Sequence, residues 1–183
     1  MIEHSSRTRC DLNGASFSHV RDDRLHLILQ HWLERRGEDG IPLRSAIDPT
    51  AIASVLPNIW LCEYQTAAER FRMRLAGEEI NKLYGRNISR CYFEEIADEK
   101  FLPIMMRRYR RVIEQPAILH CAGHIYFANA SRVIGERLGL PLRTEDGQVL
   151  QIIGASVYDI PSQQYDFAVK SEAMAEVFTP LYD

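Results

Sequence analysis

Hydrophobic and polar positions change period most clearly between residues 70 and 85. Apolar residues alternate with arginines over 70–75, which predicts a half-buried β-strand with one apolar face: Phe71, Met73 and Leu75. Gly77 then interrupts the strand. Ile80 and Leu83 form a short helical stripe that Gly85 ends. A strand therefore leads through a tight turn into a short helix.

A stronger amphipathic helix is predicted nearer the N-terminus. Five apolar side chains share one helical face, with spacing i, i+3, i+4, i+7 and i+8: Leu25, Ile28, Leu29, Trp32 and Leu33. Such a stripe packs either on its own domain or on a second copy of the chain, and Trp32 fits both arrangements. We expect it to form the interface of a homodimer, because burial at about 25 cal/mol per Å² offsets part of the cost of association.

Between these two regions the pattern predicts a second helix and a first strand. Asp48 and Pro49 are typical of a helix start, because the carboxylate caps free N–H groups and proline already has the φ of the first turn. Residues 59–64 combine β-branched and aromatic side chains, which favours a strand. We expect this strand to form an antiparallel hairpin with the strand at 70–75.

The second half of the chain predicts one longer helix followed by strands. Apolar residues keep helical spacing over 101–114, and three segments rich in β-branched residues follow around Leu119, Val133 and Ile152. A weak amphipathic helix is expected over 171–178. The fold class is therefore α+β, with a five-stranded antiparallel sheet, helices packed on one face and additional N-terminal flanking helices.

Length and composition allow one domain. The 183 residues suffice for one core with flanking helices, and 46% hydrophobic with 26% charged residues is ordinary for a globular chain. We divide the sequence into a disordered leader at 1–20, a single domain at 21–160 and a C-terminal extension at 161–183.

The chain carries no signal for membrane insertion or export. No apolar run approaches the roughly 20 residues that a membrane helix needs, and the leader lacks the apolar region of a secretory signal. Four cysteines without a C-x-x-C pair suit reduced, buried thiols. These features predict a cytoplasmic protein. The net charge of -3 gives no general electrostatic reason to bind nucleic acid.

The order of elements, together with the phrase FRMRLAGEEINKLYG, resembles a PAS domain over about 57–158. The phrases LRSAIDPTAIASVLPNIWLCEY and LRTEDGQVLQIIGASV resemble a bacterial subfamily of small stand-alone PAS proteins, which extends the likeness back to about Leu25. The resemblance implies a sheet whose concave face, with helices across it, encloses a small cavity. It implies sensing or protein contact, but neither a particular ligand nor catalysis.

By this resemblance, a small and largely apolar ligand would bind between the sheet and its helices. The sheet would contribute Phe71, Met73, Leu75, Leu119, Cys121, Ile152 and Gly154. The helices would contribute Ile80, Leu83, Tyr84, Tyr109 and Ile113. Each strand residue in this set depends on the register, since a slip of one residue exchanges the two faces.

Two cofactors of PAS domains, flavin and haem, leave signatures in the sequence. Both signatures are incomplete in this chain. Gly85, Arg86 and Asn87 are similar to the opening of the photosensory flavin motif, but Ile88 stands where the reactive cysteine would follow. Light-driven adduct formation therefore has no nucleophile, although binding of a flat ring stays open. Haem is usually held by a histidine on the long helix, and 101–114 contains none. The cofactor is left unknown.

His120, Cys121 and His124 form the only dense group of metal-ligand types. On a strand the two histidines share a face but lie about 13 Å apart, which is too far for one ion. We therefore expect two surface or half-buried histidines and no metal site.

Four arginines around Tyr109, in the sequence RRYRR, form the strongest local charge cluster. Such a cluster could bind the phosphates of an acidic phospholipid, a nucleotide or RNA. The more ordinary interpretation is a solvated helix face that is balanced by nearby carboxylates: Glu94, Glu95, Asp98 and Glu99. We expect the second and predict no binding to nucleic acid.

The motifs of common enzymes, G-x-S-x-G, the P-loop, G-x-G-x-x-G and H-E-x-x-H, do not occur. We expect a non-catalytic sensor or adaptor of bacterial signal transduction that binds a small ligand, a protein partner or both. Since the chain has no kinase, cyclase or helix-turn-helix segment, its signal must leave through a protein contact. The alternative is a small cone-shaped isomerase or hydratase with a buried acid, for which Glu63 and Tyr64 are the candidate pair.

Overall fold

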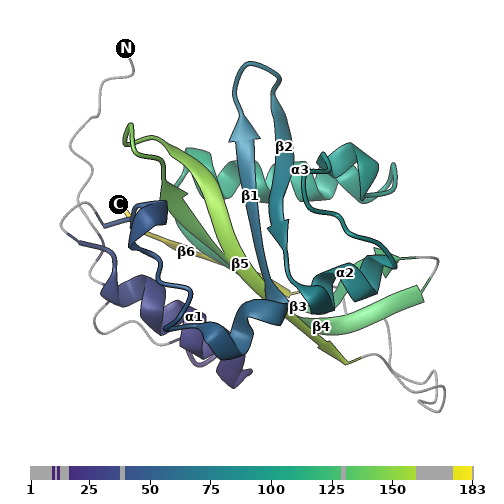
Figure 1. Ribbon diagram of the computed structural model, residues 1–183, viewed down its shortest axis with the longest axis horizontal. Coiled ribbons are helices and arrows are strands. Elements are labelled where there is room, and N and C mark those ends of the chain that lie inside the picture. The colour runs from purple at the N-terminus through teal and green to yellow at the C-terminus, as the bar shows by residue number, and fades with distance from the viewer. Residues whose placement is uncertain are drawn as a thin grey trace.

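The computed structural model describes residues 10, 12, 17–37, 40–128, 131–159 and 175–182. These residues contain one antiparallel sheet of six strands in the order β2-β1-β5-β4-β3-β6 (Figure 1). The strands are β1 (Ile59–Gln65), β2 (Arg70–Ala76), β3 (Ala117–Ala128), β4 (Ser131–Arg143), β5 (Val149–Asp159) and β6 (Ala175–Pro180). The predicted α+β class with an antiparallel sheet is confirmed, and the sixth strand is an addition to the five that were expected.

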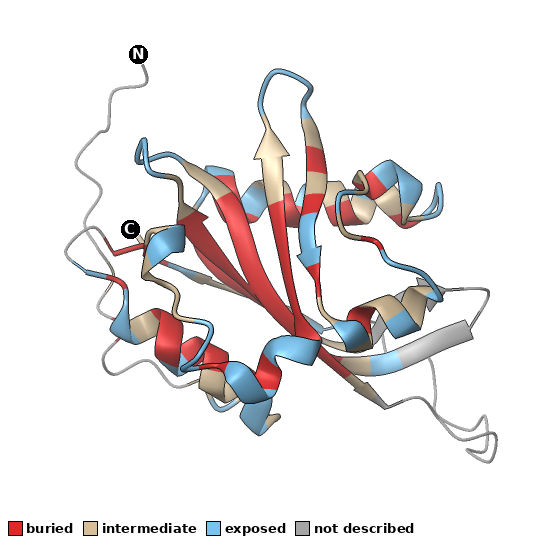
Figure 2. Ribbon diagram, viewed as in Figure 1, coloured by how far each residue is buried: buried red, intermediate tan, exposed pale blue. Residues whose placement is uncertain are grey.

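Helices cover both faces of the sheet. The helices are α1 (Asp23–Glu34), α2 (Glu78–Tyr84) and α3 (Leu102–Glu114), with three 3₁₀ turns, η1 (Arg44–Ala46), η2 (Ala53–Asn58) and η3 (Phe93–Glu95). We call the face under α2, η3 and α3 the inner face, and the face under α1 the outer face. In Figure 1, α3 crosses behind β1 and β2. Each face has its own buried apolar cluster, and Figure 2 shows buried residues along β5, the first half of β1 and one side of α1.

The predicted N-terminal helix is confirmed as α1, but its apolar stripe is covered by its own domain. Leu25, Ile28, Leu29 and Trp32 are at most 2% exposed, and Leu33 is half-buried. The Trp32 Nε1 donates a hydrogen bond to the Pro141 carbonyl over 2.8 Å. A dimer through this stripe would require α1 to leave the sheet, because the outer face of β4 and β5 is itself apolar and needs cover.

The prediction of a helix near the C-terminus is wrong for the residues that the structure describes there. Residues 171–174 lie outside the described residues, and 175–180 form β6, which pairs with β3 from Ala117↔Pro180 to Ala122↔Ala175. Val177, Phe178 and Thr179 suit a strand, and the free edge of β3 supplies backbone partners that local periodicity does not reveal. Residues 175–180 of the C-terminal extension therefore belong to the sheet.

The predicted leader at 1–20 is described only at residues 10, 12 and 17–20. Leu12 and Val20 are buried in the outer cluster, and the Cys10 N–H donates to the Leu181 carbonyl over 3.0 Å. These residues pack on the core, while the remainder of the leader lies outside the described residues.

The segment after Asp48 folds differently from the regular helix that was expected. Asp48 accepts a hydrogen bond from the Thr50 N–H over 2.8 Å, but the following residues form turns and then η2, which contains Pro57. Pro57 lacks the N–H that a longer helix would need there, so only a short turn forms. Leu56 in this turn is 39% exposed. In the part of the chain that the structure describes, no helix is long and apolar enough to cross a membrane.

Candidate functional site

Trp60 occupies the middle of the inner face, above two glycines of neighbouring strands. A Cβ on Gly154 would lie 2.2 Å from Trp60 Cζ2, and a Cβ on Gly139 would lie 3.5 Å from Trp60 Cη2. The Trp60 Nε1 donates a hydrogen bond to Ser156 Oγ over 3.0 Å. The two glycines therefore leave the space in which the indole ring lies against the sheet.

Most residues of the predicted ligand pocket come together on the inner face, but they contact one another. The buried members are Phe71, Met73, Ile80, Tyr109, Ile113, Leu119, Cys121 and Ile152, with Leu83 and Tyr84 partly buried beside them and Gly154 under Trp60. The cavity that remains has a volume of about 10 Å³, which is room for about one water molecule. Trp60 and the neighbouring aromatic side chains fill the place where the sequence predicted a ligand.

Leu75 is the exception, because it faces the other side of the sheet. Leu61 pairs with Leu75 and Cys62 pairs with Met73, so β2 has one extra residue, Arg74, at this point. A β-bulge of this kind shifts the alternation of side chains by one position. Leu75 is 46% exposed on the outer face, and its place in the predicted pocket is wrong.

A buried arginine was missed by the sequence reasoning. Arg137 Nε donates to Ser156 Oγ over 3.1 Å, its Nη1 donates to the Tyr109 hydroxyl over 3.3 Å, and its guanidinium lies 5.8 Å from the Trp60 ring centroid. The signal was present in the phrase ERLGLPL, because leucines at every second position put Arg137 and Gly139 together on the opposite face.

The cysteines of the inner face are chemically protected. Burial raises the pKa of the Cys62 thiol far above its usual range, and burial also raises the pKa of Cys121. Since the thiolate is the nucleophile, both side chains act as small apolar groups.

His120 faces the outer side of the sheet and belongs to a structural cluster. Its Nε2 lies 2.6 Å from Glu136 Oε1, and Glu136 also accepts the backbone N–H groups of Arg21 and Asp22. This cluster fixes the chain that leads into α1. The side chain of His124 lies outside what the structure describes, and the described residues contain no group of three potential metal ligands.

Glu63 and Tyr64, the pair considered for an enzyme, point to opposite faces of β1. Glu63 lies on the outer face, where it pairs with Arg74 over 3.1 Å and accepts a hydrogen bond from Gln151 over 2.9 Å. Tyr64 packs on Phe71 at the inner face. The two side chains cannot act on one substrate, because adjacent strand residues alternate in direction.

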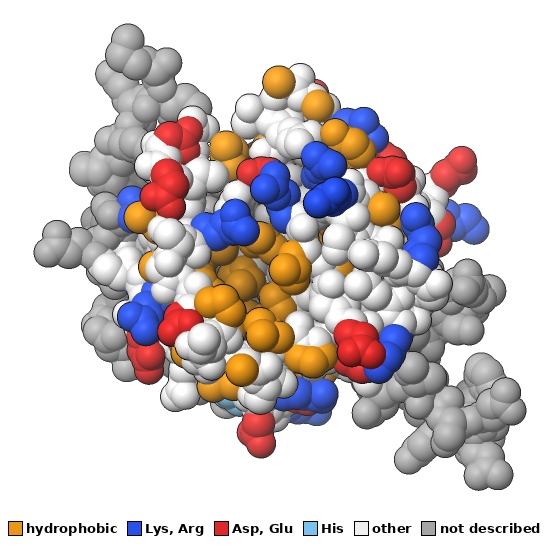
Figure 3. All heavy atoms as spheres, in the orientation of Figure 1, with side chains coloured by type: hydrophobic (Ala, Val, Ile, Leu, Met, Phe, Trp, Pro, Cys, Tyr) orange, Lys and Arg blue, Asp and Glu red, His pale blue; other side chains and the backbone are white. Residues whose placement is uncertain are grey.

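A large apolar hollow of the described residues lies on the outer face of the sheet. We call it the outer groove. Its volume is about 610 Å³, and its apolar lining comes from β1, β2, β4, β5 and the segment that contains η1 and η2: Ile47, Pro49, Ile52, Leu56, Ile59, Leu61, Leu75, Leu142 and Ile153. Charged residues at this hollow are Arg44, Glu63, Arg74 and Glu145. Figure 3 shows it as an open apolar hollow with basic side chains along one side.

The arginine cluster of α3 is divided between the core and the surface. Arg108 is buried, and its Nε donates to Glu176 of β6 over 2.8 Å. Arg107 and Arg111 are exposed and Arg110 is half-buried. Among the described residues, none of these three arginines forms an ion pair. They do not pair with the carboxylates that were expected to balance them: Glu94, Glu95, Asp98 and Glu99.

Comparison with known proteins agrees with this architecture. Residues 20–157 match a family model described as a PAS domain, and the matched range runs from three residues before α1 to two residues before the end of β5. Among curated proteins, none matches the chain. Because the family model covers most of the sequence and the antiparallel sheet with its helices agrees with it, the chain belongs to the PAS domain family.

Proposed function

We propose that this PAS domain is a non-catalytic adaptor that binds a segment of a partner protein in the outer groove. Membership of the family supports a sensor or signalling role in general. The observation that carries the finer proposal is the difference in free space, about 10 Å³ inside the sheet and helices against about 610 Å³ in the groove. Ligand sites for small molecules need about 300–1,000 Å³, so the inner cavity is too small for one.

The shape of the outer groove favours a protein segment over a small molecule. Small-molecule sites usually enclose 70–90% or more of the ligand surface, whereas this hollow is open to solvent along one side (Figure 3). An amphipathic segment can place apolar side chains against Leu56 and Leu75 and keep its polar side in water. These two leucines are among the most exposed large apolar residues that the structure describes.

The charges around the groove specify the partner further. Glu63 and Arg74 pair with each other, whereas Arg44 and Glu145 have no ion pair among the described residues. A segment that carries one acidic and one basic residue beside its apolar side chains would complement them. The enzyme alternative gains no support from this surface, because Glu63 is already a counter-ion of Arg74.

Site-specific photocrosslinking in cells tests the adaptor function. Benzoylphenylalanine at position 75 should crosslink to one protein, at an amphipathic segment, and the adduct should disappear when Leu56→Glu is added. The same probe at Val177 is the matched control, because Val177 is 37% exposed but lies on β6, outside the groove. Equal crosslinking from position 177, or no adduct from position 75, would overturn the proposal.

Native mass spectrometry tests whether the outer groove holds a small molecule instead of a protein segment. A retained molecule of a few hundred daltons that is lost in the Leu75→Glu variant would make the groove a small-molecule site and would contradict the adaptor function. Both leucines are exposed, so their substitution should change the free energy of unfolding by no more than about 0.5 kcal/mol. Loss of the crosslink would then report loss of binding.

A further inference from the structure

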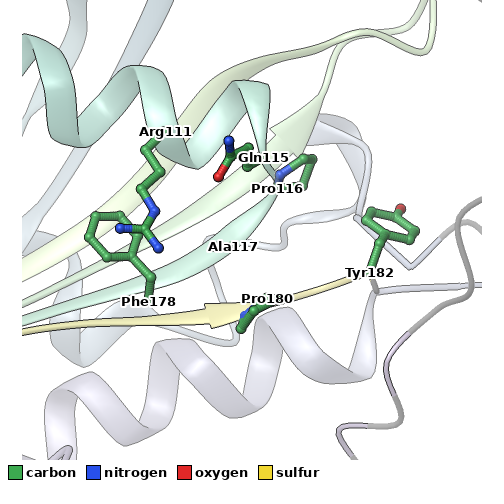
Figure 4. A pocket seen from close by; sticks show the side chains of 7 residues that line it. All are labelled: Arg111, Gln115, Pro116, Ala117, Phe178, Pro180 and Tyr182. Atoms are coloured by element: carbon green, nitrogen blue, oxygen red, sulfur yellow. The ribbon is translucent and has the colours of Figure 1, made fainter.

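A second hollow lies between the end of α3 and β6, on the opposite side of the sheet from α1. We call it the α3–β6 hollow. It has a volume of about 410 Å³, and its walls include Arg111 and Gln115 from α3, Phe178 and Pro180 from β6, and Tyr182. In Figure 4 the Arg111 side chain extends from α3 to the ring of Phe178, and Tyr182 lies at the other end of the hollow.

Arg111 is held in place by an aromatic ring. Its guanidinium carbon lies 4.0 Å from the centroid of Phe178, which is close cation–π contact. The neighbouring pair of buried Arg108 with half-buried Glu176 joins α3 to β6 and so fixes the two walls relative to each other. The site is therefore organised before any ligand arrives, which lowers the cost of binding.

A third hollow, of about 490 Å³, adjoins this one and shares Arg111 and Gln115 with it. It adds Arg107, Arg110 and Glu114 to the lining. Three arginines thus face one carboxylate, so the combined surface has a positive excess. The negative end of α3 stabilises cations in its last turn but offers no pair of oxygens that matches a guanidinium.

Three of the carboxylates near α3 make other contacts. Glu94 pairs with Arg70 over 3.1 Å, and Glu95 accepts the Tyr92 N–H. Asp98 accepts the N–H of Phe101 over 2.7 Å at the start of α3. The balanced helix face that the sequence suggested therefore does not form among the described residues, and the arginines are left for an external anion.

We propose that these adjoining hollows bind a nucleotide, with its phosphates on Arg107 and Arg111 and its base against Tyr182 at the other end of the α3–β6 hollow. Guanidinium groups match phosphate oxygens with two parallel hydrogen bonds, and a flat base packs on aromatic rings. The pairing of an anion site with an aromatic site distinguishes this ligand from a simple anion. The site is separate from the outer groove and does not depend on the adaptor function.

Isothermal titration calorimetry with ADP, adenosine and pyrophosphate tests the assignment. ADP should bind with a one-to-one stoichiometry and more tightly than either fragment. The double variant Arg107→Gln with Arg111→Gln should weaken ADP binding at least tenfold, and Tyr182→Leu should weaken ADP but not pyrophosphate. Arg35→Gln is the matched control, because Arg35 is an exposed arginine without an ion pair among the described residues, and it should leave the affinity unchanged.

Several outcomes would overturn the nucleotide site. One is the absence of saturable ADP binding, and another is equal affinity in the double arginine variant. If pyrophosphate binds as tightly as ADP, the hollow recognises an anion without a base. If polyglutamate binds more tightly than ADP, the surface recognises an acidic protein. The arginine variants change exposed side chains only, so they keep the test valid even if Tyr182→Leu disturbs the packing of the chain after β6.

Discussion

The two faces of the sheet bury apolar residues in different ways. On the inner face large rings contact one another: Phe71 stacks on Phe93 with centroids 5.1 Å apart, and Trp60 lies 5.4 Å from Tyr109. On the outer face α1 covers β4 and β5, and the side towards β1 and β2 stays open as the outer groove. The inner face, where a PAS ligand would bind, is filled. The outer face, which α1 covers in part, still has a ligand-sized hollow.

This difference shows that the number of covering helices does not decide where free space remains. Trp60 closes the inner face because Gly139 and Gly154 let its ring approach the backbone of the sheet. The outer groove remains because α1 is a single helix and spans only part of the sheet width. Free space is thus set by the size of the side chains and by the reach of each helix.

The largest expected effect on stability comes from a substitution in α1, the helix that covers part of the outer face. Trp32→Glu should cost about 5 kcal/mol or more of the free energy of unfolding, because it removes a buried ring and places a charge in the apolar cluster. Circular dichroism with sedimentation velocity should show loss of the fold. Gln30→Glu, at an exposed position of the same helix, is the control and should fold normally. A folded Trp32→Glu monomer would instead support the dimer that the sequence suggested.

A smaller but still large effect is expected from Trp60→Ala on the inner face. The variant should lose about 3–5 kcal/mol in urea unfolding, because the cavity left by the indole cannot fully collapse. Free indole should then raise the melting temperature of the variant in a concentration-dependent way, since it binds only the folded state. Wild type, whose cavity is about 10 Å³, should show no such shift. A loss below about 1 kcal/mol would mean that the inner face is loosely packed.

The smallest expected effect is a difference in cysteine labelling, which leaves the stability of the fold unchanged. It reports how tightly the inner face is closed. Because burial raises the pKa of both Cys62 and Cys121, their thiolate fraction at pH 8 is lower than that of an ordinary cysteine. N-ethylmaleimide should therefore label Cys91, which is half-buried, well before these two. All should react in urea. Native labelling of Cys62 as fast as Cys91, read by peptide mass spectrometry, would show that the inner face opens readily.

Local periodicity was sufficient for most elements and for the family. Alternation in 70–75 and helical spacing in 25–33 and 101–114 predicted β2, α1 and α3, because side-chain direction repeats with the backbone. The order of these elements was enough to suggest a PAS domain, which the family model confirms. Most residues of the predicted pocket also share one face, as the strand period required.

The tertiary structure decided what each face contacts. The extra residue at Arg74 moves Leu75 to the outer face, and the free edge of β3 turns 175–180 into a strand. The stripe of α1 covers its own sheet, and Trp60 fills the inner face above two glycines from other strands. Periodicity identifies which side chains share a face, but the partner of that face comes from residues far along the chain. For that reason neither the closed inner cavity nor the outer groove was visible in the sequence.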